Sequence, residues 1–184
     1  MSYSSDFLRD LETKFCRFGD DIGLDDDAEI AGYASVFGAA DRSGDVVQKG
    51  AYAASLKQFS AVGSGVKMLW QHDPAQPIGF WSEVREDAKG LFVRGRILEE
   101  VQAGREALAL VRAGAIEGLS IGYRTVRAAK ADDGQRHLHE IELWEVSLVT
   151  FPMLPEARVQ PSGDADDWAR SMAETFTRAR DLLA

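Results

Sequence analysis

The sequence predicts a mainly β protein with flanking helices (α+β), folded as a closed or nearly closed antiparallel barrel of about seven strands. Three observations predict this class. Apolar segments of strand length recur between residues 29 and 149, turn-forming residues separate them, and only two helical patterns lie among them. The chain of 184 residues is long enough for one domain with a core of its own.

The expected elements alternate with polar turns. One helix is expected over residues 51–59, and a clearer one over 99–113, which has an apolar face and Gly114 as its C-cap. Pro152 and Pro155 follow the last strand and end it. The expected strands cover residues 29–37, 66–72, 78–84, 91–97, 119–126 and 137–149. The turns between elements include residues 41–45, 86–90 and 130–134.

Three regions are expected along the chain. Residues 1–28 form an N-terminal helix and an acidic linker, because apolar residues recur at helical spacing over 6–16 before an acidic run. Residues 29–159 form the barrel domain. Residues 160–184 form a linker and a C-terminal helix, in which Trp168 begins the apolar pattern.

Composition limits the classes of function. The formal charge of −9 argues against broad binding of nucleic acid or of an anionic membrane surface. No apolar run approaches the roughly 20 residues that span a bilayer, and no signal peptide is apparent at the start. Cys16 is the single cysteine, so an intrachain disulfide is impossible and an intracellular compartment is expected. We interpret Cys16 as a small apolar residue.

Ser120 is a candidate nucleophile. It lies at the centre of a G-x-S-x-G pattern between Gly118 and Gly122. In α/β-hydrolases this pattern joins a strand to a following helix, whereas here a helix precedes and a strand follows, so that context is absent. The glycines would let a substrate carbonyl approach and leave backbone N–H groups for an oxyanion. The alternative is a helix-to-strand turn with an incidental serine.

His72 is the candidate base. Histidine exchanges a proton near neutral pH, and His72 ends a strand on the expected face of Val66, Met68 and Trp70. A strand end at a barrel rim combines rigid support with access. A hydrogen-bonded histidine in a turn is the alternative reading.

Glu145 is the candidate orienting residue. It shares strand parity with His139 and Ser147, and its apolar surroundings make an unpaired carboxylate costly. A hydrogen bond to His72 would pair it, and His139 is the rival for this role. Two other readings stay open. Glu145 could pair with an arginine, with Arg94, Arg96 and Arg124 as candidates. It could also join His137 and His139 in a metal site, although the ligand rules fit poorly.

The chain resembles the prohead (capsid maturation) proteases of tailed bacteriophages and of phage-derived gene transfer agents. Five segments carry the resemblance in the same order and with similar gaps, and together they span about residues 29–159. They are residues 32–37 (GYASVF), 45–52 (DVVQKGAY) with Ser55 and Leu56, 68–73 (MLWQHD) with 77–79 (PIG), 114–123 (GAIEGLSIGY), and 143–152 (LWEVSLVTFP).

The resemblance implies a serine endopeptidase with a fold similar to the herpesvirus assembly protease. It assigns the nucleophile to Ser120, the base to His72 and the acidic third member to Glu145. In the herpesvirus relatives the third member is a second histidine, which keeps His139 as an alternative. No metal or cofactor is implied.

The resemblance also implies partners and a place of action. The expected substrates are the scaffolding segment of the major capsid protein and the protease itself, inside the immature capsid in the bacterial cytoplasm. Neither nucleic acid nor a membrane is an expected partner, and homo-oligomer formation is left open. The rival functions are a non-catalytic capsid assembly or scaffold module with the same fold, and a small esterase that uses G-x-S-x-G.

Overall fold

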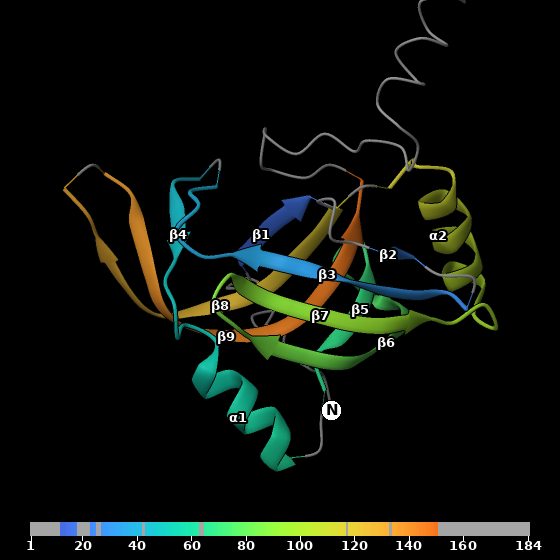
Figure 1. Ribbon diagram of the computed structural model, residues 1–184, viewed down its shortest axis with the longest axis horizontal. Coiled ribbons are helices and arrows are strands. Elements are labelled where there is room, and N and C mark those ends of the chain that lie inside the picture. The colour runs from blue at the N-terminus through green and yellow to red at the C-terminus, as the bar shows by residue number, and fades with distance from the viewer. Residues whose placement is uncertain are drawn as a thin grey trace, which may run out of the picture.

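One curled β-sheet with two helices forms the body of the molecule (Figure 1). The computed structural model describes residues 12–17, 23–24, 27–41, 43–62, 65–116, 118–132 and 134–150. The elements are β1 (Glu12–Arg17), β2 (Gly23–Leu24), β3 (Glu29–Val36), β4 (Asp45–Val47), α1 (Ala53–Val62), β5 (Lys67–Trp70), β6 (Asp73–Glu86), β7 (Gly90–Ile97), α2 (Gln102–Arg112), β8 (Gly118–Lys130) and β9 (Arg136–Val149).

The strands are joined in the order β1-β8-β9-β5-β6-β7-β3-β2, and β4 pairs with β9 outside this path. β1 and β3 approach each other, but among the described strands no ladder joins the two ends of the sheet. The sheet is therefore a curled, incompletely closed barrel, and the mainly β prediction with flanking helices is confirmed. The closed form of the prediction is not observed.

Two pairings differ from the antiparallel prediction, because β4 and β5 both run parallel to β9. The cause is the chain path between them. Helix α1 separates β4 from β5, and a helical crossover of this kind can return the chain in the same direction, which a tight turn cannot do. α1 packs against β9, so the crossover also covers part of the sheet.

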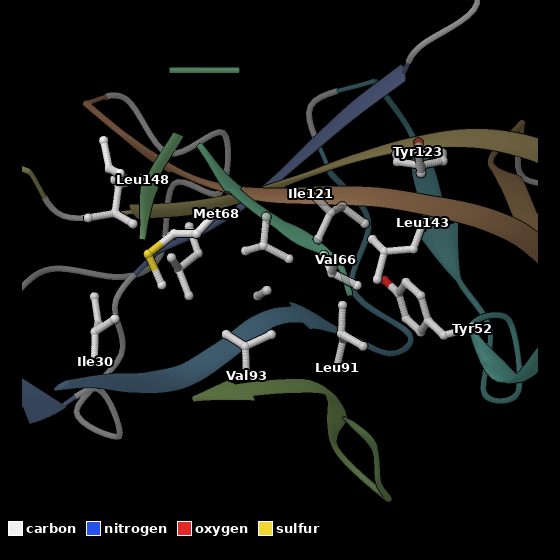
Figure 2. Close-up of a cluster of buried hydrophobic side chains, with 14 of the residues drawn as sticks. Ile30, Tyr52, Val66, Met68, Leu91, Val93, Ile121, Tyr123, Leu143 and Leu148 are labelled. Carbon is white, nitrogen blue, oxygen red and sulfur yellow. The ribbon is translucent and has the colours of Figure 1, made fainter. Parts of the chain in front are cut away.

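The core lies inside the curl of the sheet (Figure 2). Alternate residues of β7 are buried, as are residues of β5, β8 and β9 that face them. Fully burying one aliphatic side chain contributes about 1.5–3 kcal/mol, so this cluster dominates the stability of the fold. Its largest members include Ile30, Met68, Leu91, Ile121 and Leu148.

The prediction of an N-terminal helix over residues 6–16 is wrong for residues 12–16, the part of it that the structure describes. Residues 12–17 form β1, which pairs with β8 as an antiparallel edge strand. Helical spacing of apolar residues is only a weak preference, and the available ladder with β8 outweighs it. β1 and β2 thus extend the sheet to before residue 29. The expected C-terminal helix, 160–184, lies outside the described residues.

No helix in the described part of the chain is both long enough and apolar enough to cross a membrane.

Candidate active site

Ser120 lies within β8, between two paired strands. Its Cα is opposite Ser147 of β9 on one side and Phe15 of β1 on the other. The side chain of Ser120 is fully buried, and its hydroxyl donates a hydrogen bond to the backbone oxygen of Lys14 (3.2 Å).

Glu145 lies on the same face of the sheet as Ser120. Ser120 pairs with Ser147, and Gly122 pairs with Glu145, so alternate positions of both strands point to one side. A Cβ atom on Gly122 would lie 2.2 Å from Glu145 Oε1. The absence of a side chain at position 122 therefore makes room for the carboxylate, which is 6% exposed.

His72 reaches this face through a left-handed turn. β5 ends at Trp70, and Gln71 and His72 have φ angles of 52° and 63°, which are uncommon for residues with a Cβ. In β5, Met68 pairs with Val146 and faces the core. The predicted continuation of that face to His72 is wrong, because the turn directs the ring to the opposite side, toward Glu145.

The ring of His72 is held by Glu145. Its Nδ1–H donates to Glu145 Oε1 at 2.5 Å, so the pairing expected from the sequence is present. Glu145 is thus paired with a histidine rather than with an arginine. Because Nδ1 is engaged, Nε2 is the ring nitrogen through which a proton could be exchanged.

Ser147 links the two members of this pair. Its hydroxyl donates to Glu145 Oε2 (2.5 Å) and accepts a hydrogen bond from the backbone N–H of His72 (3.2 Å). The side chain is fully buried. Strand alternation in the sequence predicts that Ser147 shares the face of Glu145, but no role for Ser147 was predicted. Its position two residues after Glu145 was the signal that could have found it.

Ser120 and His72 lie on one face of three neighbouring strands, β8, β9 and β5. In the described part of the chain no hydrogen bond joins them, since the hydroxyl of Ser120 donates to Lys14. Such contacts often form only when substrate binds. The arrangement brings a buried alcohol into the neighbourhood of an imidazole that a carboxylate orients.

The remaining candidate residues either lie away from His72 or are paired in the sheet. Gly118 and Gly122 are inside β8 and are paired to both β1 and β9. His139 lies in β9 six residues before Glu145, which is roughly 20 Å along the strand. Its ring packs edge-on against that of His137, with centroids 6.4 Å apart. No group of three or more histidine, cysteine or carboxylate residues among those described could hold a metal ion.

Two of the arginines that were candidate partners of Glu145, Arg124 and Arg94, pair with other carboxylates. Arg124 pairs with Glu142 on the neighbouring strand at 2.6 Å. Arg94 lies within 3.6 Å of Glu29 and 3.9 Å of Glu83. These ion pairs are largely exposed and lie away from His72.

Residues 19–173 match the model of the Caudovirus prohead serine protease family. The chain belongs to this family. It is 29% identical over 170 residues to the prohead protease of Enterobacteria phage HK97, covering 83% of this chain and 72% of that protein. It is also 33% identical over 146 residues to the capsid polyprotein of Pseudomonas phage PAJU2, covering 74% of this chain and 20% of the polyprotein. The predicted resemblance to prohead proteases is therefore confirmed.

A solved structure supports the fold of this prohead protease family member. The bacteriophage T4 capsid assembly protease superposes with a TM-score of 0.63 at 17% identity, covering 77% of this chain and 98% of that one. At this identity the likeness concerns the fold. The two chains thus share a fold.

Proposed function

We propose that the protein is a serine endopeptidase of capsid maturation, with Ser120 as nucleophile, His72 as general base and Glu145 as the group that orients His72. The observation that carries this proposal is the 2.5 Å contact between His72 Nδ1 and Glu145, on the face of the sheet that also bears Ser120. Membership of a family of prohead serine proteases supports the reaction class.

The proposed reaction begins when His72 Nε2 takes the proton of the Ser120 hydroxyl as Oγ attacks a peptide carbonyl. Backbone N–H groups near Gly122 hold the developing oxyanion. His72 then gives the proton to the leaving amine, and water hydrolyses the acyl-enzyme. Glu145 keeps Nδ1 protonated throughout and stabilises the imidazolium that forms.

Ser147 supports this reaction without touching the substrate. It holds the carboxylate of Glu145 from the side opposite His72 and anchors the backbone of His72 in its left-handed turn. A strained conformation persists only where the surrounding contacts fix it. Ser147 is therefore a positioning residue in the proposal.

The proposed substrates are the scaffolding segment of the major capsid protein and the protease itself, and the proposed place of action is the interior of the immature capsid. The names of the relatives support a role with capsid proteins. Enclosure in the shell would keep the protease and its substrate at high local concentration.

Co-expression with the cognate major capsid protein tests the proposal. The wild-type chain should remove the scaffolding segment, and Ser120→Ala should leave it intact while still entering the particle. The rival, a non-catalytic assembly module, requires the opposite: particles of equal composition whether or not Ser120 is present. Mass spectrometry of the capsid protein and of the protease itself distinguishes the two results.

A further inference from the structure

Strand β1 covers the edge of β8 that carries Ser120. The six residues of β1 pair with β8 from Glu12 opposite Tyr123 to Arg17 opposite Gly118. The hydroxyl of Ser120 donates its hydrogen bond to the backbone oxygen of Lys14, and the side chain of Ser120 has no exposed surface. A substrate carbonyl must come within about 3 Å of this hydroxyl, so it cannot approach from the side on which the Lys14 carbonyl lies.

The edge that β1 covers has the properties of a peptide-binding edge. Extended peptides bind many proteins by adding a strand to an exposed edge, where main-chain hydrogen bonds supply affinity. If β1 were absent, β8 would be the last strand of this sheet, with Ser120 two residues after the start of the strand. Backbone groups of β8 that now pair with β1 would become available to a substrate and to an oxyanion.

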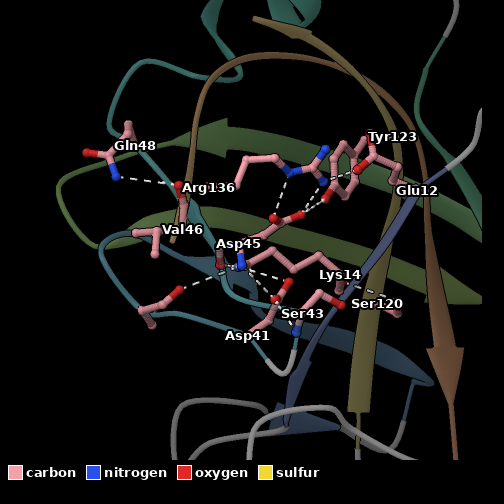
Figure 3. Close-up of polar contacts among 11 residues, drawn as sticks. Glu12, Lys14, Asp41, Ser43, Asp45, Val46, Gln48, Ser120, Tyr123 and Arg136 are labelled. Atoms are coloured by element: carbon pink, nitrogen blue, oxygen red, sulfur yellow. Dashed lines mark hydrogen bonds and ion pairs between the residues drawn. The ribbon is translucent and has the colours of Figure 1, made fainter. Parts of the chain in front are cut away.

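Polar side chains of β1 contact the strands around it (Figure 3). Lys14 is 2% exposed, and its ammonium group donates to Asp45 O (2.6 Å) and Asp41 Oδ2 (3.3 Å). Glu12 accepts hydrogen bonds from Arg136 and from Thr125 (2.5 Å). A buried ion pair usually stabilises a structure no more than apolar residues of the same volume would. The Lys14–Asp41 pair is buried and the Glu12–Arg136 pair is partly exposed, so neither ion pair adds much net stability to the attachment of β1.

The residues that contact β1 also bond to one another, and these bonds do not involve β1. Arg136 makes two hydrogen bonds to Asp45, which keep its guanidinium charged and raise its pKa further. Tyr123 donates to Asp45 Oδ2 (3.3 Å), and burial together with the charge of Asp45 raises its pKa far above the ordinary value. These groups connect β4, β8 and β9 to one another, so the surface under β1 would persist when β1 leaves.

We propose that β1 is an intramolecular strand that occupies the substrate edge of β8, and that an extended segment of the capsid protein pairs with β8 only after β1 has moved away. This inference rests on the proposed protease function and adds to it a substrate-binding edge and a closed state.

A disulfide lock tests the inference on the full chain. Cys16 is opposite Leu119 in the register of β1 and β8, and paired Cα atoms of antiparallel strands lie at about 4.5–5.5 Å, within the range of a disulfide. Leu119→Cys should therefore form a cross-link to Cys16 under oxidised glutathione. Cleavage of purified capsid protein should then fall on the order of 100-fold, because the cross-link disfavours strand separation by about that factor, and dithiothreitol should restore it.

The matched control is Cys16→Ser combined with Leu119→Cys, which keeps the core change but cannot cross-link. It should show no redox dependence. Equal cleavage by the oxidised and reduced lock variant, with the disulfide verified by mass spectrometry, would overturn the inference. Absence of cleavage by wild type and by the reduced variant alike would overturn the proposed function instead.

A second variant is expected to raise the rate of cleavage, which misfolding could only lower. Glu12→Gln removes one charge from the contact with Arg136 and keeps the side-chain size. Amide hydrogen exchange in β1 should become faster, and cleavage should rise by about fivefold, the ratio expected when one partly exposed ion pair is lost from the closed state. Faster exchange in β1 with unchanged or lower cleavage would contradict the inference.

Discussion

Gly122→Ala introduces one methyl group beneath the carboxylate of Glu145. The new Cβ would lie 2.2 Å from Oε1, 2.9 Å from Cδ and 3.0 Å from Cγ, whereas ordinary contact begins at 3.4 Å. The carboxylate must therefore retreat by about 1 Å, which breaks its 2.5 Å contact with His72. A displacement of that size in an active site costs about 100-fold in turnover.

The same substitution has a smaller effect on stability. Overpacking a well-filled site costs about 1–3 kcal/mol, and each kcal/mol lowers the melting temperature by about 2–4 °C for a chain of this length. The variant should thus remain folded at assay temperature. Gly65→Ala is the control, because a Cβ there meets no atom within 4 Å and the backbone needs no glycine conformation.

The assay is the rate of capsid protein cleavage, measured with thermal unfolding of each variant. We expect Gly122→Ala to lose about 100-fold and Gly65→Ala to retain the wild-type rate. In a Glu145→Ala background, Gly122→Ala should cost nothing further, since the space is then vacant. A folded Gly122→Ala protein with wild-type turnover would refute the claim that the position of this carboxylate controls His72.

Further predictions concern the site and the acid stability of the fold. Ser120→Ala and His72→Ala should each lower turnover by roughly 10⁴-fold or more, and the double variant should be no worse, as single-turnover cleavage can show. Ser147→Ala should lower kcat and leave KM unchanged, because Ser147 is buried, and Ser147→Thr should restore part of the loss. Asp87 accepts hydrogen bonds from the Tyr33 hydroxyl and the neighbouring backbone, which lower the pKa of Asp87. It therefore stabilises the fold above about pH 4, and this contribution falls as the pH drops further. Asp87→Asn should be less stable than wild type at pH 7 by thermal unfolding, with a smaller difference at pH 3.

The strands of the body were predictable because their apolar residues alternate or run continuously between clear turn signals. β7 and β9 lie within a residue of their expected bounds, and α2 begins three residues later than expected and ends one residue earlier. The sequence could not reveal β1, because the helical spacing of its apolar residues does not include the ladder with β8. Parallel pairing of β5 with β9 depends on where the α1 crossover returns, which no local pattern encodes.

The contact between His72 and Glu145 was predictable from the sequence, but the geometry that produces it was predictable only in part. The pairing was predicted because a carboxylate in an apolar strand needs a partner, and in the structure the partner of Glu145 is His72. The approach of His72 was missed because it depends on left-handed φ angles at two residues with side chains, which alternation along a strand does not predict. The hydrogen bond from Ser120 to Lys14 could not be predicted either, because Lys14 lies in β1, a strand that was expected to be a helix.

The register of β8 against β9 connects the core to the site. Ile121 pairs with Val146 and Leu119 with Leu148, all inside the curl, and this leaves Ser120 and Ser147 together on the opposite face. A slip of one residue would move every side chain to the wrong face. The apolar residues on either side of Ser120 therefore determine the position of the alcohol, although none of them takes part in the proposed chemistry. Enlarging the core at Ile121 should for that reason damage turnover more than an equal loss of stability elsewhere in the sheet.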